Sequence, residues 1–243
     1  MVVKSKVKYI QSLSHKKQRD ADGVFVAEGP KIVNELLAEK RVELVELFAL
    51  KEAAESLASL ADGKLTEIDE STLERMSQLS TPNQVLAVFR KPPVAPLRLQ
   101  GMLTLMLDGV QDPGNVGTIL RCADWFGVRQ VVCSADCADV FGPKAVQSTM
   151  ASIGRVQVWY EDLAALLRPA EGIAIYAAML DGTSIYEMPR VQEGVIVIGN
   201  ESKGVSDPVA ALVTSRITIP RRGHAESLNA AIAAAVILSH LAG

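Results

Sequence analysis

Continuous apolar segments alternate with helical patterns along the C-terminal part of the chain, and this alternation restricts the fold more than any other feature. The strand candidates are Leu103–Leu107, Gln130–Cys133, Val156–Trp159, Ile173–Ala178, Val195–Ile198 and Ile217–Ile219. Helical patterns lie between them, for example at Val116–Phe126 and Asp207–Val213. Strands that are apolar along their whole length are buried on both faces, which requires a parallel sheet covered by helices. The sequence therefore predicts an α/β domain.

A proline-rich segment, Lys91-Pro92-Pro93-Val94-Ala95-Pro96, separates this part from a smaller N-terminal part. Its prolines exclude a continuous helix or a central strand and favour an extended connector. We predict an N-terminal domain over 1–91, a linker over 92–98 and a C-terminal domain over 99–243. The N-terminal part also alternates, with strands expected at Val24–Ala27, Val42–Leu50 and Gln84–Phe89 and helices at Pro30–Lys40 and Lys51–Leu60. It is predicted to be a small α/β domain.

The final helix is predicted to start near Glu226 and is apolar nearly all round, because alanines alternate with Ile232, Val236, Ile237 and Leu238. A helix of this kind is buried on several sides. Its small residues allow close backbone approach, so the pattern indicates a subunit interface as well as a place in the core.

The formal net charge is −3, yet residues 1–19 carry six basic residues and no acidic one. Such a basic arm favours a local contact with a polyanion, and a merely solvated terminus is the alternative. Three cysteines do not form a disulfide framework, and no cluster of zinc ligands accompanies them. The N-terminus lacks the apolar region of a secretory signal, and no apolar stretch is long enough to span a membrane. We expect a cytoplasmic protein without metal and without membrane attachment.

Ligands of open α/β sheets bind at the carboxyl ends of the strands, and three strand ends here are polar and rich in glycine. The first strand is followed by Asp112-Pro113-Gly114-Asn115 and then by a helix. Asn115 is a good N-cap. Arg121, six residues further, is placed to point into a cleft. The alternative is that Asn115 only caps the helix and that Arg121 pairs with a surface acid such as Asp124.

The second strand end reads Gly199-Asn200-Glu201-Ser202-Lys203-Gly204. Gly199 and Gly204 permit close backbone approach or a positive φ angle. The segment is neither a GxGxxG nor a Walker motif, so a dinucleotide or P-loop site is disfavoured. Glu201 is placed to hold a substrate or a neighbouring arginine. The alternative is a plain loop in which Ser206 or Asp207 caps the next helix.

The third strand end continues through Pro220 into a basic loop with Arg221, Arg222 and His224 and then into the last helix. Ser227 and Asn229 fall where the N–H groups of a helix start are free, so capping is their alternative role. An isolated loop histidine is more often a bystander than a catalyst.

Together these segments resemble a known family. The strings DPGNVGTILRCADWFG, VIVIGNESKGVSD and IPRRGHAESLNAAIAAAVIL are similar to the three ordered motifs of the SpoU (TrmH-like) branch of the SPOUT RNA methyltransferases. Residues 8–13, 25–30 and 84–88 resemble the substrate-binding domain of that family. The resemblance covers nearly the whole chain.

The resemblance implies a C-terminal domain with a deep trefoil knot, which binds S-adenosylmethionine, and an N-terminal RNA-binding domain of the L30e type. It implies a homodimer through the knotted domain, with sites completed across the interface. The methyl acceptor would be a ribose 2′-OH in RNA, with ribosomal RNA preferred. A tRNA 2′-O-methyltransferase and a non-catalytic RNA-binding protein of the same fold are the alternatives.

Residue roles are carried over by motif. The implied catalytic residues are Asn115, Arg121, Glu201, Ser227 and Asn229. The implied cofactor contacts are Met179, Gly199, Ile219 and Leu228, together with Ser227 and Asn229. The expected RNA contacts are Lys8, Lys16, Lys17, Arg19, Arg221 and Arg222. One departure stands out, because Gln147-Ser148-Thr149-Met150-Ala151 replaces an Arg-x-Ser-x-Gly pattern of the family and so removes one cation that could contact RNA.

Overall fold

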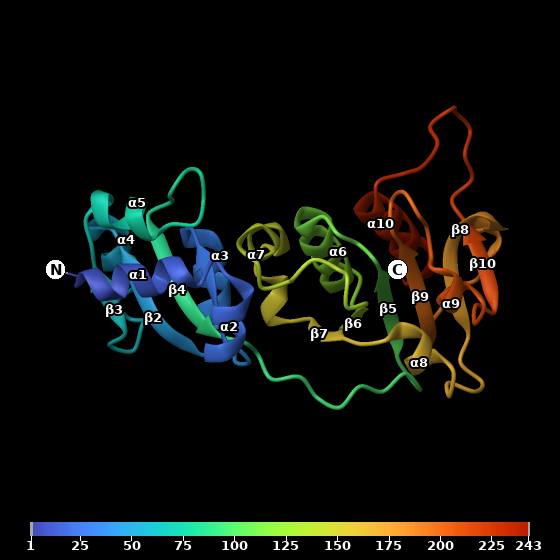
Figure 1. Cartoon of the computed structure of the whole chain (residues 1–243), viewed down its shortest axis with the longest axis horizontal. Helices are drawn as coiled ribbons and strands as arrows, with labels where there is room; N and C mark the ends of the chain where they lie inside the picture. The colour runs from blue at the N-terminus through green and yellow to red at the C-terminus, as the bar shows by residue number, and fades with distance from the viewer. Residues whose placement is uncertain (1, 243) are drawn as a thin grey trace. The chain divides into compact units, whose positions relative to one another are not determined.

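A computed structural model describes residues 2–242 of the chain, which form two compact units (Figure 1). The N-terminal unit contains the residues up to Pro93 together with the segment Asp139–Arg155. The C-terminal unit contains Val94–Ala138 and the residues from Val156 onward. The division at Pro93 falls inside the segment expected to be a linker. The return of residues 139–155 to the N-terminal unit has no sequence signal that we recognised.

The N-terminal unit is built on a mixed sheet of order β1-β4-β2-β3. Its strands are β1 (Val24–Glu28), β2 (Leu44–Ala49), β3 (Leu65–Glu67) and β4 (Val85–Arg90). β4 pairs antiparallel with β1 and β2, whereas β2 pairs parallel with β3. Each of the three predicted strands is confirmed, and its ends differ from the prediction by no more than two residues. β3 was not predicted because it is short and mostly exposed.

Helices cover this sheet. They are α1 (Lys4–Ser12), α2 (Lys16–Asp22), α3 (Pro30–Ala38), α4 (Lys51–Leu57), α5 (Glu70–Met76) and α7 (Pro143–Thr149). α1 buries Val7 and Ile10 against core residues that include Leu73 and Met76 of α5. The expected basic arm is therefore a packed pair of helices with its lysines on the outer surface, because the apolar residues of α1 recur at helical spacing.

The C-terminal unit contains a sheet of order β10-β8-β9-β5-β6-β7, and every pairing in it is parallel. The strands are β5 (Leu103–Asp108), β6 (Gln130–Cys133), β7 (Gln157–Tyr160), β8 (Ile175–Ser184), β9 (Gly194–Gly199) and β10 (Ser215–Thr218). The prediction of a buried parallel sheet is confirmed. β8 is longer than predicted, so Met179 lies inside this strand rather than at its end.

Helices cover both faces of the parallel sheet, as Figure 1 shows. They are α6 (Pro113–Trp125), α8 (Leu163–Leu167), α9 (Asp207–Ala210) and α10 (Ala230–Leu241), and two 3-10 turns lie at Ser152–Gly154 in the N-terminal unit and at Ile185–Glu187. α8 and α9 pack on the face that carries Met106, Val132 and Val197. α6 and α10 pack against each other, and α10 also contacts β9.

The last helix begins at Ala230, four residues later than the start predicted near Glu226. The preceding stretch from Pro220 to Asn229 is exposed throughout and irregular. One face of α10 is buried through residues such as Ala234 and Leu238, whereas Ile232 remains 55% exposed. The helix is thus apolar nearly all round but is buried on only one side within this chain.

Candidate active site

Three side chains from the three polar strand ends form one hydrogen-bond chain. Asn229 Nδ2 donates to Asn115 Oδ1 at 3.0 Å, and Asn115 Nδ2 donates to Glu201 Oε1 at 2.5 Å. The parallel sheet explains this convergence, because β5 and β9 are direct neighbours and their carboxyl ends lie side by side. Asn115, Glu201 and Asn229 are therefore brought together.

Asn115 is positioned by the start of α6. The N-cap of this helix is Asp112, whose side chain accepts a hydrogen bond from the backbone N–H of Asn115. The expectation that Asn115 is the N-cap was wrong, because Pro113 takes the first helical position and moves the cap to the preceding residue. Since Asn115 has no capping role, its side-chain amide is free to bind both Glu201 and Asn229.

A tight loop after β9 presents Glu201. Asn200 and Gly204 exchange two backbone hydrogen bonds, and the Asn200 side chain donates to the Gly109 carbonyl and accepts from two loop N–H groups. A Cβ on Gly199 would lie 2.3 Å from the carbonyl carbon of Gly204, so only glycine allows this closure. Glu201 is half-buried, and within the described residues its protein partner is Asn115 rather than an arginine.

Asn229 has two roles in the fold of one chain. Its side-chain oxygen accepts from the backbone N–H groups of Ala231 and Ile232, so it caps α10, which is the alternative role considered for it from the sequence. Its side-chain nitrogen is left to donate to Asn115. Ser227 lies two residues earlier in the exposed stretch and makes no hydrogen bond in the part of the chain that the structure describes.

Arg121 does not join this cluster. It is exposed on α6 and makes no hydrogen bond or ion pair to any residue between 2 and 242. The six residues that separate it from Asn115 rotate its side chain by about 120° around the helix and move it about 9 Å along the axis. The two residues therefore face different directions within one chain.

The residues implied as cofactor contacts lie at or near the same sheet edge. The pairing of Ala177 with Val197 leads, two residues further along each strand, to Met179 and Gly199. Ile219 directly follows β10, and Leu228 is 46% exposed in the stretch before α10. The pairing of β8 with β10 skips five residues of β8, 178–182, because Ala177 pairs with Arg216 and Thr183 pairs with Ile217.

The predicted RNA contacts differ in their availability. Lys8 and Lys17 are exposed, and Lys16 is exposed beside Asp20 at 2.8 Å. Arg221 and Arg222 are exposed in the loop before α10, and Arg221 donates to the Ala225 carbonyl. Arg19 is only 3% exposed and is bound by Asp139 and by the carbonyls of Leu13 and Ser14. Its guanidinium holds the N-terminal unit together and is not presented to a ligand.

The departure at 147–151 also has a structural role. Gln147 Nε2 donates to the Glu28 carbonyl at 2.9 Å, which ties α7 to the end of β1. Met150 and Ala151 both have positive φ angles, 46° and 70°, which favour glycine. Ala151 occupies the position where the family pattern has glycine, so this chain keeps the backbone conformation with a less favourable residue.

Sequence reasoning missed several residues that shape the site. Asp112 caps α6, Asn200 closes the loop that holds Glu201, and the Asp108 carboxylate accepts from the Ser206 N–H at 2.7 Å. An aspartate directly before a proline at a helix start is a recognisable N-cap signal for Asp112. The partner of Asp108 lies 98 positions away, and Asn200 joins its own loop to Gly109, 91 positions away, so no signal in the sequence identified these two long-range hydrogen bonds.

A thiol also lies next to the first strand end. The hydrogen bond with Cys133, helped by Ser134 and by the N–H groups of Val110 and Gly109 and opposed by burial, lowers the pKa of Cys137 to about 7. All three cysteines are free. Among residues 2–242 there is no group of three or more side chains suited to hold a metal ion, and no helix there is long and apolar enough to cross a membrane.

The comparisons with known proteins agree with this geometry. Residues 102–239 match the SpoU rRNA Methylase family, and residues 4–87 match the MRM3-like substrate binding domain. The 23S rRNA (guanosine(2553)-2′-O)-methyltransferase RlmP of Bacillus subtilis is 31% identical over 98% of this chain and 96% of its own length.

Solved structures agree as well. A TrmH-family protein from Porphyromonas gingivalis is 40% identical, with a TM-score of 0.88 over 99% of this chain and 98% of that one. An AdoMet-bound rRNA methyltransferase from Sinorhizobium meliloti is 27% identical, with a TM-score of 0.85 over 99% and 95% of the two chains.

The fold and the clustered strand-end residues define an S-adenosylmethionine-dependent RNA ribose 2′-O-methyltransferase. The chain belongs to the SpoU rRNA Methylase family and carries the substrate-binding domain at its N-terminus. The family predicted from the three motifs is thereby confirmed.

Proposed function

We propose that this protein methylates a ribose 2′-hydroxyl of ribosomal RNA at the site formed by Asn115, Glu201 and Asn229. The observation that carries the proposal is the hydrogen-bond chain through these three side chains, because it joins all three family motifs at one edge of the sheet. RNA is favoured over DNA, since the acceptor hydroxyl exists only on ribose.

The names of two relatives support ribosomal RNA as the substrate. The Bacillus subtilis relative is named for a guanosine of 23S rRNA, and a Streptomyces viridochromogenes relative, 30% identical over 77% of this chain, is named for a uridine of 23S rRNA. The two target nucleotides differ while the RNA is the same. We therefore assign the RNA class and leave the choice of nucleotide to the substrate-binding surface.

The sheet edge fits S-adenosylmethionine. Apolar side chains are left uncovered beside the strand ends, with Leu180 78% and Leu228 46% exposed, and an adenine ring would cover such surfaces. Gly199 offers a backbone without a side chain at the same edge. We propose that Met179, Gly199, Ile219 and Leu228, with Ser227 and Asn229, hold the cofactor. When bound, it supplies an electrophilic methyl group on a sulfonium, whose sulfur would leave as a neutral thioether.

The protein has to position the ribose and stabilise the charge that develops on its oxygen. Glu201 uses one carboxylate oxygen for Asn115, and its second oxygen makes no hydrogen bond to the described residues. We assign this second oxygen to the ribose. Asn115 and Asn229 fix the carboxylate, and Ser227 joins them when the exposed stretch before α10 closes on the ligands.

Arg121 is assigned to the phosphate next to the target ribose and to the developing alkoxide. A guanidinium has a pKa above about 12, so electrostatic stabilisation is favoured over a role as general base. Because Arg121 faces away from the Asn115 cluster of its own chain, we propose that it serves the site of a second copy in a homodimer. The 83% exposed Trp125 on the same helix and the 55% exposed Ile232 on α10 support an interface there.

The proposal extends to two features of the fold, a knot in the C-terminal domain and the type of the N-terminal domain. We propose that the C-terminal domain, residues 99–243, carries the trefoil knot of the SPOUT enzymes and that residues 1–91 form an L30e-like domain joined by the linker 92–98. The order β10-β8-β9-β5-β6-β7 supports the first assignment, and the β1-β4-β2-β3 sheet with helices on its faces supports the second. A cytoplasmic location fits three free cysteines.

Lys8, Lys16, Lys17, Arg221 and Arg222 are proposed to contact RNA phosphates, because all five are exposed cations. Arg19 is withdrawn from this set on account of its burial. The decisive experiment maps 2′-O-methyl positions in cellular RNA with and without the gene and then restores them with purified protein and cofactor. The loss and recovery of one position in ribosomal RNA is expected. A lost position in tRNA, or no lost position at all, would refute the assignment.

A further inference from the structure

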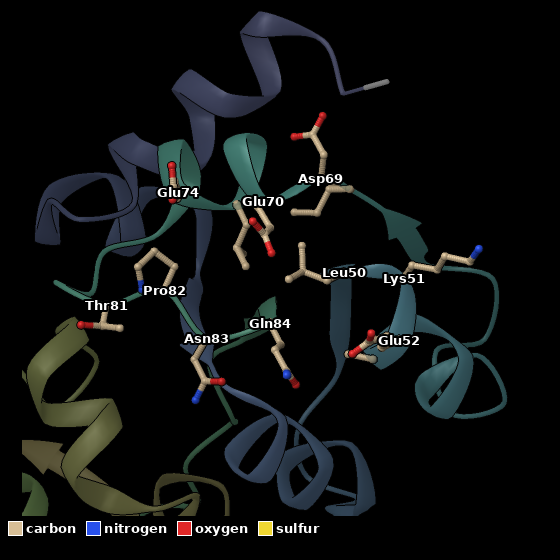
Figure 2. A pocket seen from close by; sticks show the side chains of 13 residues that line it. Leu50, Lys51, Glu52, Asp69, Glu70, Glu74, Thr81, Pro82, Asn83 and Gln84 are labelled. Carbon is tan, nitrogen blue, oxygen red and sulfur yellow. The ribbon is translucent and has the colours of Figure 1, made fainter.

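A cavity in the N-terminal unit is lined by none of the residues assigned to catalysis. Three segments line it, namely the start of α4 after β2, the start of α5 after β3, and the turn before β4 (Figure 2). Its volume is about 740 Å³, which is within the range of small-ligand sites. Leu50, Ile68 and Leu73 give it an apolar wall. The cavity is therefore large enough and apolar enough to take a flat ring.

The charge of the lining excludes a phosphate as the ligand. Four carboxylates and one ammonium line the cavity, from Glu52, Asp69, Glu70, Glu74 and Lys51. Asp69 is already engaged, because its carboxylate accepts from Thr72 and Ser71 and caps α5. Glu52 and Glu70 make no hydrogen bond to the described residues, so they are available to a ligand. In Figure 2 they come from two different helices, α4 and α5.

An amide completes the polar part of the lining. Gln84 has a positive φ angle of 52°, and its backbone carbonyl accepts from the N–H of Leu50. This hydrogen bond fixes the turn to the end of β2. The exposed side chain of Gln84 makes no hydrogen bond to residues 2–242, and it supplies both a donor and an acceptor beside the cavity.

We propose that this cavity recognises an unpaired guanine base of the RNA substrate, a proposal that rests on the proposed function. A carboxylate accepts two hydrogen bonds side by side, and guanine presents its N1–H and N2–H groups side by side on the Watson–Crick edge. Adenine and cytosine place an acceptor next to their amino group, which a carboxylate repels. The apolar wall contacts the face of the base, and the amide of Gln84 binds the remaining polar edge.

The match of residues 4–87 to a substrate binding domain supports RNA as the source of the ligand, because this range includes the whole lining of the cavity. Carboxylates repel the phosphates of the RNA strand, so only an unstacked base can enter. The exposed lysines of α1 and α2 are available to bind the phosphates of the RNA strand.

The test measures binding of the full-length protein to labelled hexaribonucleotides. One probe contains a single guanosine among uridines, a second has inosine in its place, and a third contains only uridines. Inosine lacks the N2 amino group and therefore one of the two proposed donors. We expect the guanosine probe to bind at least fivefold more tightly than the other two. Equal binding of all three probes would overturn the proposal.

The variant E52Q/E70Q keeps the shape of both side chains and removes their charge. It is expected to lose the preference for guanosine while its binding of the uridine probe stays unchanged. Glu55→Gln is the matched control, because Glu55 lies exposed on α4 and does not line the cavity. Gln84→Gly provides a second test that does not depend on a folding defect, since glycine suits the positive φ angle. It is expected to weaken the guanosine preference at least threefold.

Two further readouts separate this inference from the proposed function. Methyl transfer to ribosomal RNA without any effect of E52Q/E70Q on guanosine binding would refute the cavity assignment and leave the enzyme assignment intact. Loss of binding to an arginine-rich peptide in E52Q/E70Q, with the RNA preference unchanged, would show that the cavity takes a cationic protein segment instead. Absence of methyl transfer by the wild type would refute the proposed function itself.

Discussion

Asn229 donates a hydrogen bond to Asn115 across 114 positions of sequence, at 3.0 Å. Asn229 also caps α10, so the first turn of the last helix and the first turn of α6 are held in one arrangement. Glu201 is attached to the same pair through Asn115. The geometry of the site therefore depends on the first turns of α6 and α10, and not only on the residues at the strand ends.

Glu201→Gln is expected to lower kcat by about 10- to 100-fold, because it removes the negative charge proposed to act on the ribose hydroxyl while keeping the shape. Methyl transfer at saturating RNA and cofactor measures the effect. The unfolding temperature should stay unchanged, since Glu201 is only half-buried. Glu187→Gln, on an exposed turn of the same unit, serves as the control. Full activity of Glu201→Gln would remove the carboxylate from the mechanism.

Arg121→Ala is expected to reduce the methylation rate at saturating cofactor and to leave the affinity for S-adenosylmethionine nearly intact. The reason is that Arg121 is exposed and is assigned to RNA and to the developing charge rather than to the cofactor. Single-turnover kinetics and calorimetry of cofactor binding check the two parts. Arg129→Ala, an exposed arginine beyond the end of α6, is the comparison. Unchanged turnover in Arg121→Ala would exclude a part in the chemistry.

Gln84→Gly is expected to stabilise the protein by about 0.5 kcal/mol. Relief of a left-handed backbone at a non-glycine residue gives about 1–2 kcal/mol, and the greater entropy of glycine in the unfolded chain offsets about half of it. Glu55→Gly, in an exposed helical position of α4, should instead destabilise by about 1 kcal/mol. Denaturant unfolding of the two variants should therefore give shifts of opposite sign. Equal shifts would show that residue 84 is not strained.

The stability of the N-terminal unit should fall as the pH rises from mildly acidic to neutral, because burial raises the pKa of Glu28 in spite of hydrogen bonds from Ser77 and Gln78. A carboxyl whose pKa is raised in the folded state stabilises that state below its ordinary pKa. This contribution is lost as the pH rises through the raised value.

Glu28→Gln should remove this dependence, since the amide oxygen can accept from the Gln78 N–H and the amide NH2 can donate to the Ser77 hydroxyl, both without a charge. Thermal unfolding of wild type and variant between pH 4 and pH 8 measures the effect. The unfolding temperature of the variant should rise relative to that of the wild type with increasing pH. A constant difference between the two across that range would contradict the prediction.

RNA affinity should decrease with salt, and the double substitution of Lys8 and Lys17 by alanine should lower the slope of log K against log salt concentration by about 1 to 2. Both side chains are exposed and neither has an acidic partner in the described residues. Titrations at several salt concentrations give the slope. Arg19→Ala is unsuitable for this purpose, because it leaves Asp139 without its partner and destabilises the unit. A slope that stays the same in the double variant would show that Lys8 and Lys17 do not contact RNA phosphates.

Much of the fold could be predicted from local patterns. The parallel sheet follows from strands that are apolar throughout, and β9, buried from Gly194 to Ile198, shows this most clearly. The length of β8 could not be predicted, because its second half is mostly exposed and polar and is held by Thr183 and Ser184 pairing with β10. Such pairing depends on a distant strand and leaves no periodic signal.

For the site, the residues that converge on the sheet edge were predictable and their local roles were less so. Asn115 looked like an N-cap, but a proline two positions earlier moved the cap to Asp112. Arg19 looked like a free cation, yet Asp139 lies 120 positions away in sequence and binds it at 2.6 Å. Burial by a distant partner is invisible in a single sequence. The direction of Arg121 likewise depends on helix geometry that motif spacing does not report.

The double use of Asn229 couples the proposed active site to the first turn of the last helix. If the first turn of α10 frays, the acceptor oxygen of Asn229 loses its backbone N–H partners, and the amide that orients Asn115 goes with it. By the proposed function, molecules in which this turn is frayed would keep the parallel sheet folded but would lose methyl transfer.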